Sequence, residues 1–304
     1  MTRREFLKLA SLSAGALGLT ALDLSRLEEA LANVDGPNVI WLQGASCTGC
    51  SVSFLNRIAT SAPTSAADVL INLINLRYHP QLMAVAGQSA AEQARAAYDS
   101  GNFILAVEGG VPTAFGGHAC SAWTYNGQDV TLLEAVKSLA PRAKAVLSIG
   151  TCASFGGIAA APPNSAAIKS VSAATGVQTI NIAGCPVHPD WIVWAIAQLL
   201  AGKTITRDSY GRPTALYGRT VHDQCPRRST DETERLGVEG RCLKELGCRG
   251  PETRCSCPST LFNGRVNWCI GANAPCTGCT EPSFSGTSAF YEHVGGGGGG
   301  IDDD

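Results

Sequence analysis

The chain has 304 residues, a formal net charge of −2 and 45% hydrophobic residues. This length suffices for one large domain or two ordinary ones, and the composition excludes a largely disordered chain. The near-neutral charge gives no reason to expect nucleic acid or an anionic membrane surface as a partner. Thirteen cysteines are many for this length, and an odd number excludes a disulfide framework that uses them all.

Residues 1–32 have the pattern of a twin-arginine export signal. Thr2–Lys8 contains two adjacent arginines, an apolar stretch runs from Leu9 to Leu22, and Ala30–Ala32 offers a small-x-small cleavage site. The apolar stretch is shorter than the roughly 20 residues that a membrane span needs. We therefore predict export to the periplasm, with an ordinary amphipathic helix as the alternative. Retention of the signal would allow a weak peripheral association with the membrane.

Residues 38–203 alternate between short apolar runs, which predict buried strands, and longer periodic segments, which predict helices. This alternation implies a parallel sheet covered on both faces, so we expect a flavodoxin-like doubly wound α/β domain over residues 33–203. The expected strands are Val39–Gln43, Phe103–Val107, Ala145–Ile149 and Thr179–Ile182, and the expected helices are Ser51–Ile58, Ala91–Tyr98, Leu132–Leu139 and Asp190–Leu200.

Four cysteines follow three of the predicted strands. Cys47 and Cys50 form a CxxC motif after the first strand, and Cys152 and Cys185 follow the third and fourth. Ligand sites in an open parallel sheet gather at the carboxyl ends of the strands, so the four thiols should converge. Four thiolates suit a [4Fe-4S] cluster, with a zinc site as the alternative. Glu108 is expected near this site, or else as an ordinary strand-end carboxylate.

The composition changes after residue 203. Residues 204–294 are rich in proline, glycine, cysteine, arginine and threonine, and they contain few apolar runs. Residues 204–219 predict a linker with a turn at Gly211–Pro213, and the remainder predicts a loop-rich module with two short helices. Metal clusters rather than apolar packing are expected to hold this module together. The tail 295–304, a glycine run followed by acidic residues, is predicted to be flexible.

Two further groups of candidate ligands lie in this module. One group contains a histidine and three cysteines, which suits zinc or a [4Fe-4S] cluster with mixed ligands. A neutral imidazole in place of a thiolate raises the reduction potential of such a cluster. The other group contains four cysteines and ends in a second CxxC motif. The first group is His222, Cys225, Cys242 and Cys248, and the second is Cys257, Cys269, Cys276 and Cys279.

Eleven cysteines and one histidine give twelve ligands, enough for three sites of four ligands each. The other two cysteines, Cys120 and Cys255, are assigned to burial or to no role, although Cys255 could replace Cys257 as a ligand. The remaining histidines are expected to satisfy local hydrogen bonds. They are His79, His118, His188 and His293.

Several motifs resemble the small subunit of nickel-iron hydrogenases, and they extend over nearly the whole chain. Jointly they are far more specific than any single CxxC motif. They are Trp41–Ser51, Gly150–Cys152 with Gly156–Ile158, Gly184–Trp191, Tyr217–Arg219 with His222 and Cys225, Cys242–Thr253, and Cys276–Cys279.

The resemblance implies an electron-transfer subunit with three clusters in a line, paired with a large subunit that carries nickel and iron. That pair would interconvert hydrogen with protons and electrons. The proximal cluster would face the large subunit, and the distal cluster would lie near a surface where a periplasmic cytochrome or another acceptor docks. The implied ligands are Cys47, Cys50, Cys152 and Cys185 (proximal), Cys257, Cys276 and Cys279 (medial), and His222, Cys225, Cys242 and Cys248 (distal).

This sequence departs from the family pattern at several positions. Cys269 stands where many members have proline and a [3Fe-4S] medial cluster, so we predict a [4Fe-4S] medial cluster as in the nickel-iron-selenium branch. Gly49 and Gly157 stand where the oxygen-tolerant branch has extra cysteines, so no tolerance is expected by that route. Ser46 stands where many members have glutamate, which weakens a proton-transfer role there.

Two alternatives stay open on the sequence alone. One is an iron–sulfur subunit of a non-hydrogenase respiratory complex, such as the related cluster subunit of respiratory complex I. The other is a zinc-stabilised binding protein without a redox role. The first would have adjacent cysteines at its first site and lack the histidine-bearing module, and the second would be colourless.

Overall fold

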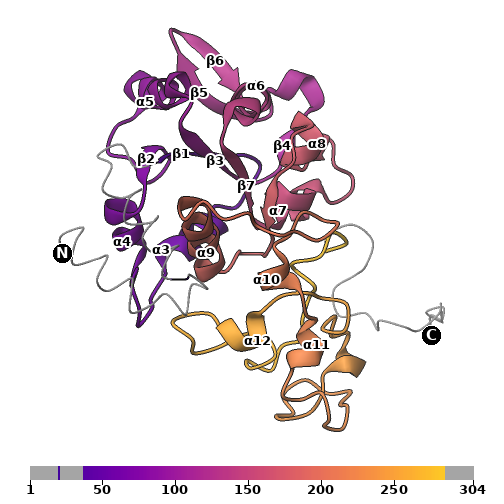
Figure 1. Ribbon diagram of the computed structural model, residues 1–304. Coiled ribbons are helices and arrows are strands. Elements are labelled where there is room, and N and C mark those ends of the chain that lie inside the picture. The colour runs from indigo at the N-terminus through magenta and orange to yellow at the C-terminus, as the bar shows by residue number, and fades with distance from the viewer. Residues whose placement is uncertain (1–19, 21–36, 285–304) are drawn as a thin grey trace.

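The computed structural model describes residue 20 and residues 37–284. Almost all of the predicted export signal, the predicted tail and His293 therefore lie outside the described residues. A parallel sheet of five strands forms the centre of the molecule, in the order β2-β1-β3-β7-β9 (Figure 1). This is the flavodoxin-like order, so the predicted fold class is confirmed. The strands are β1 (Asn38–Gln43), β2 (Asn75–Tyr78), β3 (Phe103–Glu108), β7 (Ala145–Ile149) and β9 (Ile180–Ile182).

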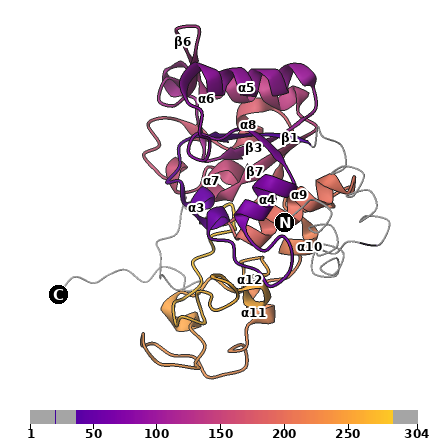
Figure 2. The same ribbon diagram turned by 90° about the vertical axis from the view of Figure 1, so that its left-hand side faces the viewer.

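Helices cover both faces of the sheet, as Figures 1 and 2 show. Successive strand residues point to opposite faces. Trp41 and Ile104 therefore join the core cluster on one face, whereas Ile40 and Leu105 join the cluster on the other. The first face packs against α3 (Gly49–Leu55), α4 (Ala66–Asn72) and α9 (Pro189–Leu200), and the second against α5 (Gly87–Ser100), α6 (Leu132–Leu139) and α8 (Val171–Thr175).

Local sequence signals fix several helix ends. A capping box begins α6, because the Thr131 side chain accepts from the Glu134 N–H while the Glu134 carboxylate accepts from Thr131. Pro189 occupies the first turn of α9, and the His188 ring accepts from the Asp190 N–H. Gly101 ends α5 in the left-handed conformation, at φ 65°.

The structure departs from the predicted elements in a few places. The fifth strand, β2, is absent from the prediction, because it is a half-buried edge strand whose sequence shows no apolar run. The first helix begins at Gly49 and ends at Leu55, earlier at both ends than predicted. The short elements of this region are β4 (Val111–Pro112), β5 (Ser121–Tyr125), β6 (Gln128–Thr131), β8 (Ile168–Lys169), α7 (Gly150–Phe155), η1 (Ala114–Gly117), η2 (Ala140–Arg142) and η3 (Ile158–Ala160).

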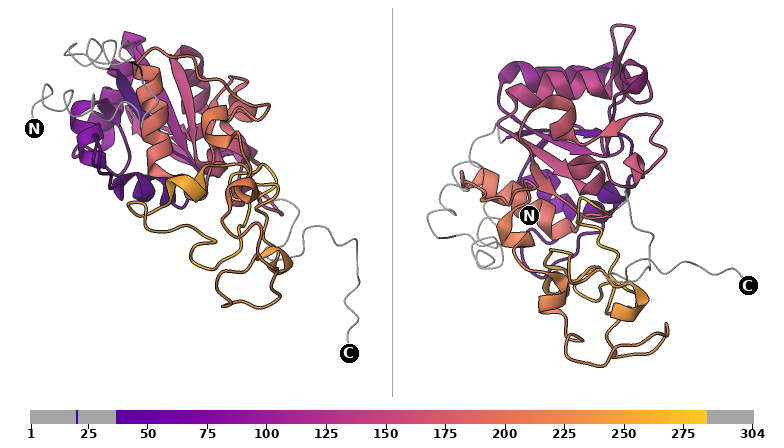
Figure 3. Two further views of the ribbon diagram at one scale, coloured as in Figure 1. Left: turned by 60° about the horizontal axis from the view of Figure 1, so that its bottom comes forward. Right: turned by 90° about the vertical axis from the view of Figure 1, so that its right-hand side faces the viewer.

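The loop-rich C-terminal part lies on one side of the α/β domain (Figures 2 and 3). Residues 204–219, predicted to be a linker, pack against the rest of the protein. They contain α10 (Thr214–Tyr217), and the side chains of Arg212 and Tyr217 are buried. Beyond residue 219 the described chain forms two short α-helices, as predicted. They are α11 (Val221–Gln224) and α12 (Cys257–Thr260), and η4 (Lys244–Leu246) lies between them. No helix among the described residues is long and apolar enough to cross a membrane.

Candidate metal centres

The proximal group consists of Cys47, Cys50, Cys152 and Cys185, which the sheet brings together at the carboxyl ends of β1, β7 and β9. Cys50 lies in the first turn of α3, and Cys152 lies in the first turn of α7. Cys185 follows β9. Burial is the largest cause of the raised pKa of Cys50 and of Cys152; the charges of Cys152 and Cys185 add to it at Cys50, and the charge of Cys47 adds to it at Cys152. The four cysteines therefore lie at one edge of the sheet, while their binding of a single cluster stays a prediction.

Glycines leave room for these sulfurs. A Cβ on Gly150 would lie 2.5 Å from the Cys50 Sγ, and a Cβ on Gly157 would lie 2.8 Å from the Cys152 Sγ. Both glycines have positive φ, at 84° and 54°. Any larger residue would meet a sulfur and strain the backbone. The donor set and this glycine cradle fit a thiolate-bound cluster.

Burial disfavours bare thiolates in this group. Desolvation raises the pKa of Cys50 well above its usual value, and the Glu108 carboxylate adds to the effect. Burial, followed by the charges of Cys152 and Cys47, raises the pKa of Cys185 to about 11. Four such thiolates are stable together only beside positive charge, which the irons of a cluster supply.

Glu108 is a buried carboxylate at the start of α3. It accepts hydrogen bonds from the backbone N–H groups of Cys50 and Ser51, at 3.0 and 3.2 Å. The Ser51 hydroxyl donates to the same carboxylate and contacts Nε2 of His79. The Trp41 indole donates to it as well, at 3.4 Å. Glu108 therefore lies beside the proximal group, as the sequence indicates, and it also fixes the end of α3 that carries Cys50.

The distal group consists of His222, Cys225, Cys242 and Cys248. His222 and Cys225 lie on and just after α11, and the charges of Cys248 and Cys242 raise the pKa of Cys225, after burial as the larger cause. Gly250 lies between the loop of Cys248 and α11, because a Cβ on it would lie 3.5 Å from the Cys248 Sγ and 3.6 Å from the backbone nitrogen of His222. The structure thus brings the three cysteines together and places His222 next to their loop.

The medial group consists of Cys257, Cys269, Cys276 and Cys279. Burial is the largest cause of the raised pKa of Cys279 and of Cys276, the latter to about 12. A side-chain hydrogen bond to Cys255 and then burial raise the pKa of Cys257. After burial, the charge of Cys255 also raises the pKa of Cys269. The structure therefore places a fifth cysteine, Cys255, in this region.

Hydrogen bonds link the three groups in series. The hydroxyl of Thr151, next to the proximal Cys152, donates to the carbonyl of Cys279 in the medial group. The N–H of Cys276, a medial residue, donates to the Sγ of Cys248 in the distal group, at 3.3 Å. The medial and distal groups are therefore in contact through a peptide N–H and a sulfur, and the proximal and medial groups are linked through a residue adjacent to a proximal cysteine.

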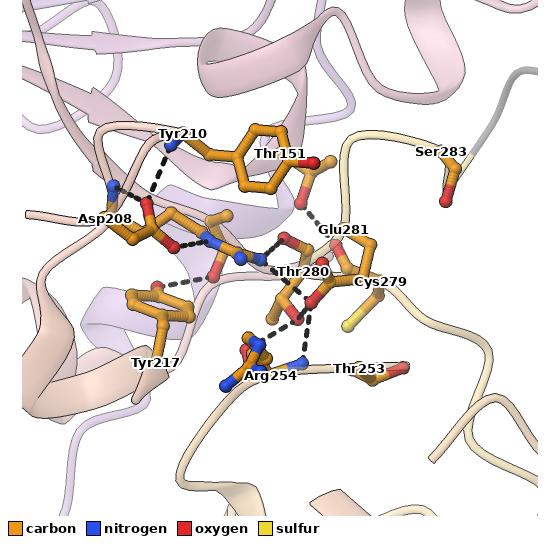
Figure 4. A network of polar contacts seen from close by, with 12 residues as sticks. Thr151, Asp208, Tyr210, Tyr217, Thr253, Arg254, Cys279, Thr280, Glu281 and Ser283 are labelled. Carbon is orange, nitrogen blue, oxygen red and sulfur yellow. Dashed lines mark hydrogen bonds and ion pairs between the residues drawn. The ribbon is translucent and has the colours of Figure 1, made fainter. Parts of the chain in front are cut away.

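A buried polar network ties the medial CxxC motif to the α/β domain (Figure 4). Arg212 is 1% exposed, and its guanidinium binds Asp208 at 2.9 Å and Glu281 at 2.8 Å. It also donates to the Thr280 carbonyl, next to Cys279. Thr151 adds a second tie: its hydroxyl accepts from the Gly184 N–H at 2.9 Å and donates to the Cys279 carbonyl.

Sequence reasoning misses three of these features. The sequence marks Thr151 only as a motif residue and Arg212 only as a turn residue, and it assigns Cys255 to burial, to no role or to the place of Cys257. A CxC spacing is the available signal for Cys255, while nothing local marks Arg212. The described part of the chain contains no group of three or more His, Cys, Asp or Glu side chains arranged to hold a single metal ion. None of the thirteen cysteines, all described, forms a disulfide.

The other histidines act locally, as expected, wherever their contacts are seen. His79 bonds Ser51 and accepts from the Gln81 N–H at 3.1 Å. His188 accepts from the Asp190 N–H and contacts the Leu261 carbonyl.

A doubly wound sheet with converging cysteines at its carboxyl edge, followed by a cysteine-rich module in contact with that edge, is the architecture of an iron–sulfur electron-transfer protein. Residues 47–199 match the family model described as NADH ubiquinone oxidoreductase, 20 Kd subunit. Residues 217–292 match the model that describes the C-terminal part of the NiFe/NiFeSe hydrogenase small subunit.

Full-length relatives identify the family. The chain is 38% identical to the periplasmic [NiFe] hydrogenase small subunit of Solidesulfovibrio fructosivorans, over 96% of this chain and 93% of that one. It is 35% identical to the periplasmic [NiFeSe] hydrogenase small subunit of Desulfomicrobium baculatum, over 96% and 98%. The chain therefore belongs to the small subunits of nickel-iron and nickel-iron-selenium hydrogenases, which are electron-transfer subunits that pair with a large subunit.

Solved structures agree with this assignment. A [NiFeSe] hydrogenase structure from Desulfomicrobium baculatum matches with a TM-score of 0.77 and 35% identity, over 85% of this chain and 99% of that one. The recombinant [NiFeSe] hydrogenase from Desulfovibrio vulgaris Hildenborough matches with a TM-score of 0.76 and 38% identity, over 82% and 94%. Since these full-length relatives and the C-terminal family model are hydrogenase small subunits, the alternative of a non-hydrogenase respiratory complex is wrong.

Proposed function

We propose that this subunit relays electrons through three iron–sulfur clusters between a hydrogen-converting site on a large subunit and an external redox partner in the periplasm. The observation that supports the proposal is the series of hydrogen bonds, from Thr151 to the Cys279 carbonyl and from the Cys276 N–H to the Cys248 sulfur, that links the proximal, medial and distal groups. Groups linked in this way leave only short steps between the centres that they would hold, which is what stepwise electron transfer requires.

Each group would hold one [4Fe-4S] cluster through its four side chains, and a bound cluster supplies reversible one-electron chemistry. The chain itself would bind the irons through eleven thiolates and the imidazole of His222 and would keep their positions fixed. Cys269 supplies the fourth thiolate of the medial group; without it, three thiolates would suit a [3Fe-4S] cluster. EPR of the oxidised protein should therefore lack a stoichiometric three-iron signal.

The surface beside Cys47 fits the large subunit. Cys47 is exposed, and three large apolar side chains are also exposed along and just beyond α3, namely Val52, Leu55 and Ile58. A row of exposed apolar residues next to a cluster ligand is typical of an interaction surface. The large subunit, which would carry nickel and iron and perform the reaction H2 = 2 H+ + 2 e−, would cover this row and exchange electrons with the proximal cluster.

The distal group would pass electrons to a periplasmic cytochrome or another acceptor. A periplasmic location agrees with the names of the relatives and with the twin-arginine pattern of residues 1–32. Residues 33–203 would form the domain of the proximal cluster, and residues 204–294 the domain of the other two. The tail 295–304 would follow as a flexible segment.

The proximal cluster would be of the ordinary kind. An added Cβ at Gly157 would lie 2.8 Å from the Cα and N atoms of Cys152, so a cysteine there would require a backbone shift. The geometry supports glycine and no supplementary thiol at this position. Steady turnover under air would contradict the resulting expectation that the enzyme lacks oxygen tolerance by that route.

The experiment that tests the function is the change Cys50→Ala in the heterodimer of small and large subunits. We expect loss of the proximal cluster, roughly four irons per heterodimer, and loss of hydrogen-dependent dye reduction. Cys120→Ala is the matched control, because Cys120 is a half-buried cysteine outside all three groups. Full hydrogen-dependent activity of the Cys50→Ala heterodimer would refute the proximal assignment.

A further inference from the structure

A small cavity lies outside the three cysteine groups, where the residues just beyond α3, the first turn of α9 and the end of α12 come together (Figure 1). Its volume is about 150 Å³, which suffices for one small ion together with water. Polar side chains form much of its wall, and none of the lining residues belongs to the twelve candidate cluster ligands. They include Arg57, Ile58, Asp190, Trp191, Thr260 and Arg265.

Two residues of this wall carry a buried N–H group that has no hydrogen-bond partner among the described residues. One group is Nε1 of Trp191, which is 1% exposed, and the other is Nε of Arg57, which is 5% exposed. The Arg57 Nε lies 3.2 Å from Oδ1 of Asp190 as an ion pair, without the geometry of a hydrogen bond. Since an unpaired buried donor is costly and rare in native proteins, these two groups indicate that an acceptor belongs in the cavity.

The charges around the cavity indicate that this acceptor is an anion. Of the described residues that line it, three are charged: two arginines, Arg57 and Arg265, and one carboxylate, Asp190, so one positive charge is left over. Burial lowers the pKa of Arg57, and the charges of Asp190 and then Asp68 offset this effect only in part. The first turn of α9 adds the positive end of its helix dipole. An anion therefore fits the cavity better than a neutral acceptor such as water.

We propose that the cavity binds inorganic phosphate, held by the guanidinium groups of Arg57 and Arg265 and by the indole N–H of Trp191. A guanidinium group matches the paired oxygens of an oxyanion better than it matches a halide. Asp190 then decides between oxyanions, because phosphate near neutral pH keeps an O–H that can donate to a carboxylate, whereas sulfate has none and is repelled. The volume leaves no room for a nucleoside, so free phosphate is the expected ligand.

The test is isothermal titration calorimetry of the phosphate-free heterodimer with inorganic phosphate and with sulfate, at one ionic strength. We expect a single phosphate site and sulfate binding that is at least about tenfold weaker, because a hydrogen bond to a charged group is worth about that factor. Trp191→Phe removes the Nε1–H and keeps an aromatic ring, so its phosphate affinity should fall by about tenfold. Trp123→Phe is the matched control, because Trp123 lies on β5 and does not line the cavity. Asp190→Asn should bring the two affinities closer together, because an amide can donate to sulfate.

Arg265→Gln is a second variant that spares the core, because Arg265 is exposed. It should bind phosphate several times more weakly, whereas Arg95→Gln, which changes an exposed arginine on α5, should bind as wild type does. Absence of phosphate binding to wild type in calorimetry and in equilibrium dialysis would overturn the inference, as would unchanged affinity in both Trp191→Phe and Arg265→Gln. Equal affinities of wild type for phosphate and sulfate would overturn the role of Asp190. None of these outcomes bears on iron content, so the inference can fail while the three-cluster function stands.

Discussion

At the scale of single residues, Glu108 shows how one side chain serves both the sheet and the proximal group. It ends β3, yet its carboxylate accepts hydrogen bonds from the N–H groups of Cys50 and Ser51 in the first turn of α3. The N-terminus of a helix stabilises a negative charge at this place. Burial is the larger cause of the raised pKa of the Cys50 thiol and Glu108 adds to it, an effect that positive iron would offset. The carboxylate thus orders the ligand backbone before a cluster binds.

His79 should make stability depend on pH. Burial lowers its pKa to about 4, below the value of about 6.5 in an unfolded chain. The unfolded state therefore binds a proton first, so stability is fully present above about pH 6.5 and is lost as the pH falls towards 4, by up to about 3 kcal/mol. The melting temperature of wild type should drop between pH 7 and pH 5 more than that of His79→Gln. Equal drops in the two proteins would refute this role.

Gly150 should be intolerant of a side chain. In Gly150→Ala the new Cβ would meet the Cys50 Sγ at 2.5 Å, so the sulfur or the backbone must move. We expect loss of roughly four irons, measured by iron analysis of the heterodimer. Gly127→Ala is the control, because Gly127 has a similar φ of 73° but open space around it. Its cost should be about 1 kcal/mol of strain without loss of iron. Full iron content in Gly150→Ala would show that the cluster does not need the space that Gly150 leaves for the Cys50 sulfur.

At the scale of elements, the segment between the two parts of the chain is structural. Residues 204–219 contain few apolar runs and a turn at Gly211–Pro213, so their sequence predicts a linker. The structure instead buries Arg212 between Asp208 and Glu281 and buries Tyr217, whose hydroxyl donates to the Ala183 carbonyl at 2.7 Å. The ion pair of Arg212 and Glu281 joins residues 69 apart in the sequence, so local composition cannot predict it.

Replacing Arg212 should loosen the C-terminal part. Arg212→Ala leaves two carboxylates close together without their cation, a loss that typically costs about 3–5 kcal/mol for a buried pair. A fall of about 10 °C in melting temperature is expected. Arg95→Ala is the matched control, because the Arg95–Asp99 pair is exposed and should contribute nothing measurable. A melting temperature of Arg212→Ala equal to that of the control would show that the network is not structural.

At the scale of the whole molecule, the sequence predicts the sheet because four of its strands are short apolar runs. It does not predict β2, a half-buried edge strand. The convergence of Cys47, Cys50, Cys152 and Cys185 follows from the rule that sites form at carboxyl strand ends. Contacts between groups cannot be predicted in this way, since the Cys276 N–H donates to a sulfur 28 residues earlier in the sequence, that of Cys248. The assignment of irons to all three groups stays a prediction.

The three-cluster relay is tested by the iron, sulfide, nickel and zinc content of this protein purified with its partner. Three [4Fe-4S] clusters would give about twelve cluster irons and as many sulfides on this subunit, with one nickel on the partner and no zinc. Iron and sulfide without nickel in the heterodimer would contradict the assignment to a working hydrogenase. Zinc without sulfide would contradict the account as a whole, because the twelve side chains would then be ligands of a structural metal and not of an electron relay.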